Sequence, residues 1–65
     1  MQLGELIRIT EPCSVRLRVY KDGLVRGTVD YEAQRTELML EKYGGADVMM
    51  LATTPDGLMV EIAVE

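Results

Sequence analysis

Two Asp-Gly pairs, each between stretches of alternating apolar residues, constrain the fold of this chain more than any other feature. The first pair, Asp22-Gly23, separates residues 14–20 from residues 24–29, and the odd positions from Val15 to Val19 are all apolar. Alternation with a period of two is typical of a half-buried strand. Asp-Gly is a favoured hairpin turn because glycine tolerates a positive φ. The pattern therefore predicts a β-hairpin here.

The second pair, Asp56-Gly57, predicts another hairpin nearer the end of the chain. Its strands are expected over residues 46–52 and 58–65, with a turn over residues 53–57. In that turn a proline presets φ and the glycine takes the left-handed position. Every second residue from 58 to 64 is apolar, so the last strand should bury one face.

The segment between the hairpins, residues 30–43, is predicted to be a helix. Asp30 is suited to an N-cap and Gly44-Gly45 to the end of the helix. Val29 and Tyr31 continue the alternation of the preceding strand, so an extension of that strand is the open alternative.

The first segment, residues 1–9, fits a two-turn helix or a short strand. An internal echo favours the helix, because Glu5-Leu6-Ile7 resembles Glu37-Leu38-Met39 and the Asp22-Gly23 turn resembles the Asp56-Gly57 turn, at offsets of 32 and 34 residues. Chance similarity between any two hairpins is the competing explanation.

Residues 1–65 are therefore expected to form one α+β domain with a two-layer αββαββ arrangement. We expect a four-stranded antiparallel sheet with both helices on one face, which is a stable two-layer solution. The alternative, βββαββ, has the first segment as a strand. A core this small supplies roughly 3–5 kcal/mol. With one cysteine and no histidine, neither an internal disulfide nor a zinc site can help, which favours self-association.

The residue types needed for catalysis are missing or isolated. Histidine, the commonest general base, is absent, and Cys13 lies next to Pro12 and near Glu11, which would disfavour a thiolate. Glu37 and Glu41 are expected to form a solvated helix flank rather than a metal site. The sequence thus predicts no enzyme, no catalytic residues, no cofactor and no metal.

The net charge of −4 is unevenly distributed. Residues 1–26 carry five basic and three acidic groups, hence +2, whereas residues 27–65 carry two basic and eight acidic groups, hence −6. Nonspecific nucleic-acid binding depends on phosphate neutralisation and is unlikely for an acidic chain. Weak binding through Arg16, Arg18 and Arg26 stays open.

No stretch approaches the roughly 20 apolar residues of a membrane-spanning helix. The first residues also lack the basic start and apolar run of a signal peptide. Together with the single thiol, these features favour a cytoplasmic protein without a membrane contact.

The face of the sheet that points away from the helices is the candidate interaction surface. The strand after residue 46 is apolar on both faces, although a solvated sheet face should be polar. Either this face is an interface, or the first segment or a terminus folds over it. The candidate interface residues are Arg16, Arg18, Tyr20, Arg26, Met49, Leu51 and Met59.

Several segments resemble small proteins encoded in phages and prophages of gut Firmicutes. They are Leu3-Gly4-Glu5-Leu6-Ile7, Val19-Tyr20-Lys21-Asp22-Gly23, Leu40-Glu41-Lys42-Tyr43-Gly44 and Asp56-Gly57-Leu58-Met59-Val60-Glu61-Ile62. The resemblance implies an origin in a mobile element and carries no site residues.

The leading functional hypothesis is a non-enzymatic protein-interaction module that self-associates, as a possible homodimer, through the exposed sheet face, with any further protein partner unknown. An alternative is a phage-type inhibitor of a host nuclease or defence complex whose acidic half imitates phosphates. The other alternative is the weak nucleic-acid binding described above.

Overall fold

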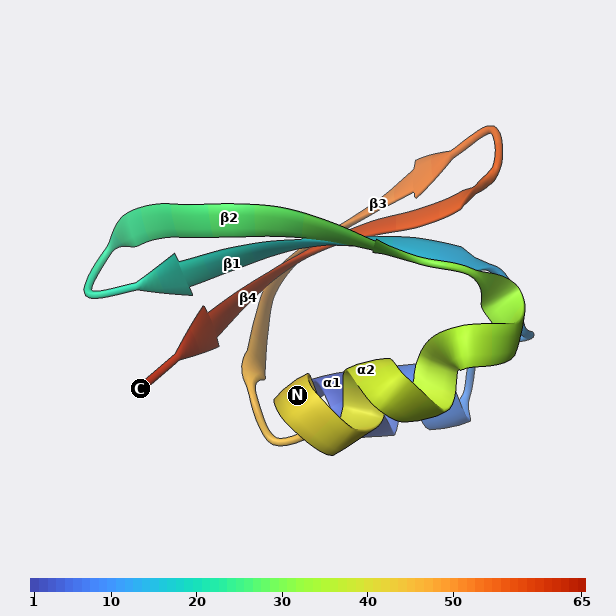
Figure 1. The fold of residues 1–65 in the computed structure, drawn as a ribbon, viewed down its shortest axis with the longest axis horizontal. Helices are drawn as coiled ribbons and strands as arrows, with labels where there is room; N and C mark the ends of the chain where they lie inside the picture. The colour runs from blue at the N-terminus through green and yellow to red at the C-terminus, as the bar shows by residue number, and fades with distance from the viewer.

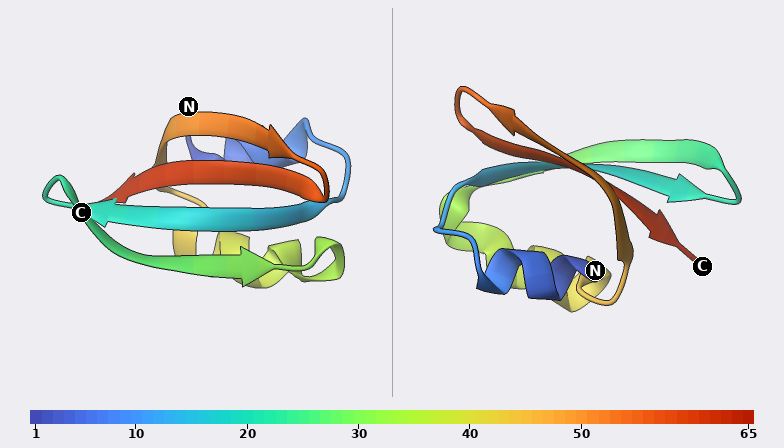
Figure 2. Two further views of the ribbon diagram at one scale, coloured as in Figure 1. Left: turned by 90° about the horizontal axis from the view of Figure 1, so that it is seen from above. Right: turned by 180° about the vertical axis from the view of Figure 1, so that it is seen from behind.

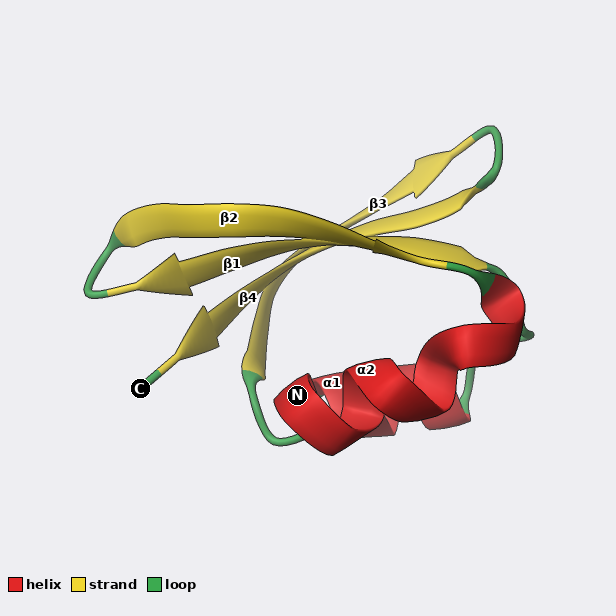
Figure 3. Ribbon diagram, in the orientation of Figure 1, coloured by secondary structure: helices red, strands yellow, loops and turns green.

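The computed structural model describes residues 1–65 and contains two hairpins and two helices, in the order helix, two strands, helix, two strands (Figures 1 and 3). The predicted αββαββ order is confirmed. The elements are α1 (Leu3–Arg8), β1 (Ser14–Lys21), β2 (Leu24–Tyr31), a short 3-10 turn η1 (Ala33–Arg35), α2 (Thr36–Tyr43), β3 (Asp47–Thr54) and β4 (Gly57–Val64).

The first hairpin closes through the two-residue turn Asp22-Gly23, as predicted. Both residues have positive φ, 55° and 78°, which is the type I′ geometry that matches the twist of the flanking strands. The ladder contains a β-bulge, because Val19 pairs with Gly27 whereas Tyr20 pairs with Val25. The bulge interrupts the alternation of β2.

The second hairpin is tighter than predicted. Only Pro55 and Asp56 lie between the strands, because Thr53 and Thr54 belong to β3 and Gly57 begins β4. Gly57 has a positive φ of 159°, which side chains rarely adopt, although it lies outside the left-handed helical region that was predicted. Space is a second constraint, since a Cβ at this position would overlap the carbonyl oxygen of Ser14 on β1.

The predicted helix over residues 30–43 is correct only in its second half. Asp30 lies in β2, where it pairs with Arg16, so its assignment as an N-cap is wrong. Strand pairing continues to Tyr31 because β1 offers partners along its whole length. The helix α2 then ends at Tyr43, with Gly44 as its C-cap, as expected.

The first segment is a helix, so the alternative βββαββ arrangement is wrong. The Glu5 side chain accepts a hydrogen bond from the Gln2 backbone N–H, which stabilises the start of α1. Backbone hydrogen bonds then join Leu3 to Ala46 and Gly4 to Gly44, both at 2.9 Å. The helix is thereby docked against the loop between α2 and β3.

The sheet has the strand order β2-β1-β4-β3, and its central pair, β1 and β4, is parallel (Figure 2). The prediction of a wholly antiparallel sheet is therefore wrong. The reason lies in α2, which carries the chain back along the length of the sheet, so that β3 starts at the end opposite to where β2 finished (Figure 1). β3 then runs parallel to β2, and consequently β4 runs parallel to β1.

Both helices cover the same face of the sheet, as predicted (Figure 1). All buried sheet residues belong to the two central strands, whose apolar alternation is the cleanest in the sequence. The echo between the two halves is not a structural repeat, because the first strand of one hairpin and the second strand of the other are central. The eight core residues are Leu3, Leu6, Val15, Leu17, Val19, Met39, Val60 and Ile62.

Neither α1 nor α2, with six and eight residues, has the length and apolar character required to cross a membrane.

Candidate interaction surface

The face of the sheet that points away from α1 and α2, here called the outer face, is covered by no other element (Figures 1 and 2). Neither the first segment nor the end of the chain folds across it, since α1 lies on the opposite face (Figure 1). The alternative in which the first segment or a terminus covers this face is therefore wrong. The outer face is therefore the candidate interaction surface.

Strand pairing arranges the outer face in rows that cross the sheet from β2 to β3, because directly paired residues share a face. The first row is Asp30, Arg16, Met59 and Ala52; the second is Thr28, Arg18, Glu61 and Met50; the third is Val25, Tyr20, Ala63 and Asp47. The first two rows therefore combine polar residues on β2 and β1 with an apolar residue on β4 or β3, whereas the third row has Val25 on β2 and Asp47 on β3.

The first row contains an ion pair between neighbouring strands. Arg16 Nε donates to Asp30 Oδ1 at 2.7 Å, and the two side chains are 59% and 67% exposed. This hydrogen bond and the opposite charge lower the pKa of the Asp30 carboxyl and raise the pKa of Arg16. Exposed pairs contribute little to stability, but this one neutralises the guanidinium.

The second row is more enclosed. Glu61 Oε2 accepts from Arg18 Nη1 at 3.1 Å and from the Tyr20 hydroxyl at 3.2 Å. The Glu61 side chain is only 15% exposed, against 40% for Arg18. One carboxylate on β4 therefore fixes two of the predicted interface residues, both on β1.

The apolar part of the outer face differs from the prediction. Met59 faces outward as expected, but its apolar neighbours are Met50 and Ala52 rather than Met49 and Leu51. A β-bulge lies between Val48 and Met50, so the alternation of β3 shifts by one residue there. Placing Leu51 on this face was therefore wrong, whereas Met49 is the extra residue of the bulge and has no strand partner that assigns it to a face.

Leu51 pairs with the core residue Val60, which puts it on the helix-covered side of the sheet. It nevertheless stays 48% exposed, because it lies on the edge strand. Met49 occupies the bulge and is 50% exposed. Both residues are thus accessible at the β3 edge.

The first bulge alters β2 in the same way. Val25 pairs with the outward Tyr20 and is 54% exposed. Arg26 is the extra residue of this bulge and is the only one of the three predicted basic residues without a salt bridge. Two of the three predicted basic residues, Arg16 and Arg18, are therefore paired with carboxylates.

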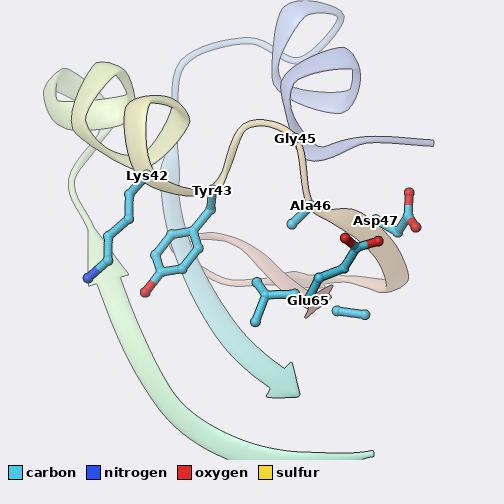
Figure 4. A pocket seen from close by; sticks show the side chains of 8 residues that line it. Lys42, Tyr43, Gly45, Ala46, Asp47 and Glu65 are labelled. Atoms are coloured by element: carbon cyan, nitrogen blue, oxygen red, sulfur yellow. The ribbon is translucent and has the colours of Figure 1, made fainter. Parts of the chain in front are cut away.

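The structure has two shallow hollows, and the larger one is lined in part by Ala63 and Asp47 of the third row. The larger, about 280 Å³, lies where the end of α2 meets the start of β3 and the end of β4. Figure 4 shows Lys42 and Tyr43 on one side and Asp47 and Glu65 on the other, and Lys42 Nζ lies 5.3 Å from the Tyr43 ring centroid. It contains neither a thiol nor a pair of groups in hydrogen-bond contact, so it has no recognisable nucleophile and base.

The smaller hollow, about 100 Å³, includes the half-buried Cys13 beside Glu11 and Pro12. No basic side chain lines it. No group of three or more acidic or cysteine side chains is placed to hold a metal ion.

No protein-family model, no curated protein and no solved structure matches this chain.

Proposed function

We propose that the chain is a non-enzymatic protein-interaction module, and that it self-associates by packing its outer face against that of a second copy. The observation that carries the proposal is the uncovered outer face, on which Met50, Ala52, Met59 and Ala63 adjoin the Arg18–Glu61–Tyr20 cluster. Methionine adapts to irregular contacts, and tyrosine and arginine are enriched at interface hot spots. We also propose that the protein is cytoplasmic and originates from a mobile element.

Charge favours a second copy as the occupant. The rows of the outer face hold two arginines, Arg16 and Arg18, and three acids, Asp30, Glu61 and Asp47, so these groups sum to −1. The whole chain has a net charge of −4. This face carries only a small part of the net negative charge, so packing two such faces together brings little like charge into contact.

The size of the core favours the same occupant. Eight of 65 residues are buried, and five of them lie on only two strands. A domain of this length is marginal by itself, and stability gained from a partner rises with the concentration of that partner. A second layer over the outer face would give the sheet a buried face on each side.

The test is sedimentation equilibrium of the wild-type chain and of Met59→Lys over a range of concentrations. Met59 lies on a central strand, so the substitution places a charge in the middle of the outer face without altering a sheet edge. We expect a concentration-dependent dimer for the wild type and a monomer for Met59→Lys.

Leu38→Lys is the matched control, because it adds the same charge on α2 at a side chain that is 52% exposed on the opposite layer. It should dimerise like the wild type, and circular dichroism should show that all three chains are folded. A monomeric wild type, or equal dimerisation of Met59→Lys and Leu38→Lys, would refute the proposal.

The two alternative functions remain predictions. The ion pairs of Arg16 and Arg18 leave Arg26 alone for phosphate contacts, which gives nucleic-acid binding little support. Glu37 and Glu41 are both exposed, and solvation of α2 accounts for them as well as a phosphate-mimicking role does.

A further inference from the structure

The two edges of the sheet are unequal. The β2 edge carries Arg26 and Asp30, and charged residues on an edge strand oppose pairing with another chain. The β3 edge has no charged residue from Val48 to Thr54, and its apolar residues Met49, Met50 and Leu51 are 50%, 40% and 48% exposed. Both edge strands also contain a bulge, which is another form of edge protection, so charge distinguishes the two edges and β3 is the less protected one.

The start of this edge already pairs with another segment of the chain. The Val48 N–H donates to the Met1 carbonyl oxygen at 2.8 Å, and Gln2 forms an antiparallel bridge with Asp47. Beyond these contacts, no strand lies next to Met49–Thr54. The unoccupied part of the edge is therefore the uncharged part.

We propose that this free segment pairs antiparallel with the same segment of a second copy, which would join two four-stranded sheets into one of eight strands. An antiparallel pair of identical strands has two-fold symmetry, the commonest symmetry of soluble dimers. The absence of charge between Val48 and Thr54 means that no like charges face each other within the ladder. A second copy can therefore pair with the free backbone N–H and C=O groups of this edge through the same six residues.

This contact differs from the outer-face dimer proposed above, because it is made by backbone groups at the edge of β3. Met50 and Ala52 belong to both surfaces, whereas Met59 belongs only to the outer face. The edge contact is also small, since the free segment has only six residues. Stable interfaces bury roughly 1,200–2,000 Å². We therefore expect a weak association that is best captured covalently.

The position for capture is Leu51, because it faces the helix side and is near the middle of the free segment. Val29 is its matched counterpart on the other edge: Leu51 pairs with Val60 and Val29 pairs with Leu17, both core residues with no exposed surface. The two side chains are 48% and 36% exposed.

The experiment uses Leu51→Cys and Val29→Cys, each in a Cys13→Ser chain, treated with a short thiol-specific bifunctional cross-linker. We expect covalent dimer from Leu51→Cys at a yield at least fivefold above Val29→Cys, and a higher yield with added salt, which screens the repulsion between chains of net charge −4. Equal yields from the two chains would overturn the inference.

A further substitution separates this contact from the outer-face dimer. Met59→Lys added to the Leu51→Cys chain should leave the yield unchanged, because the edge does not include Met59. Loss of the covalent dimer in that chain would show that the cross-link depends on the outer face, and would also overturn the edge contact. If Leu51→Cys forms the covalent dimer and Met59→Lys does not change the sedimentation behaviour, the edge contact is supported and the outer-face dimer is refuted.

Discussion

Glu61 on β4 and Arg18 on β1 form an ion pair across the parallel central strands, with Glu61 Oε2 3.1 Å from Arg18 Nη1. The same oxygen accepts the Tyr20 hydroxyl. The parallel register places Arg18 directly opposite Glu61. Tyr20 lies two residues further along β1, on the same face of the sheet. This cluster therefore depends on the pairing that the sequence analysis did not predict.

We expect Glu61→Ala to lower the free energy of unfolding by about 1 kcal/mol, because it removes the acceptor of two donors at a site that is only 15% exposed. Glu61→Gln, which keeps an acceptor, should lose less. Asp30→Ala, which breaks the more exposed pair, is the control and should also lose less than Glu61→Ala. Urea denaturation measures all three, and an equal loss for Asp30→Ala and Glu61→Ala would contradict the expectation.

The Arg16–Asp30 pair should be visible in a pH titration. The side-chain hydrogen bond from Arg16 lowers the pKa of Asp30 in the folded chain. Its stabilising effect is thus fully present above the ordinary aspartate pKa of about 3.9 and is lost as the pH falls through the lower folded value. Carboxyl-carbon NMR should show a pKa of Asp30 below that ordinary value.

Arg16→Ala should return the pKa of Asp30 toward the ordinary value. Arg18→Ala is the matched control, because Arg18 contacts Glu61 instead. A pKa of Asp30 that stays the same in Arg16→Ala would show that the ion pair does not persist in solution.

Gly57→Ala tests the close approach of β4 to β1. A Cβ on Gly57 would overlap the Ser14 carbonyl oxygen, so the parallel pair would have to separate at its first residues. Overpacking of this kind costs about 1–3 kcal/mol, a large part of the roughly 3–5 kcal/mol available to a domain of this size.

Gly27→Ala is the control for this substitution, since a Cβ there would contact nothing within 4 Å. Its unfolding midpoint should change little, whereas that of Gly57→Ala should fall clearly. If the two variants unfold at the same urea concentration, β1 and β4 do not approach each other in this way.

The features of the fold that were predicted correctly depend on residues close together in the sequence. The Asp22-Gly23 turn needs only two adjacent residues that tolerate positive φ. Helix α1 needs Leu3 and Leu6 on one side and Glu5 to accept from Gln2. Local chemistry of this kind acts over three or four residues, so a single sequence is enough to reveal it.

The candidate site was predicted only in part. Arg16, Arg18, Tyr20 and Met59 lie on the outer face as expected, because the ladder between β1 and β4 has no register shift and the extra residue of the first bulge lies in β2. Leu51 does not, because one extra residue in β3 reverses the alternation. A bulge is defined by the partner strand, and nothing in residues 47–54 identifies that partner.

The sequence by itself determined the element types, the first turn and which strands could bury an apolar face. Only the tertiary structure decided that β1 and β4 are parallel, that Asp30 pairs with Arg16 instead of capping a helix, and that Leu51 lies at an open edge. The physical reason is that strand neighbours are chosen by contacts between distant segments. Those contacts set the face of each side chain, and α2 sets the direction of the second hairpin.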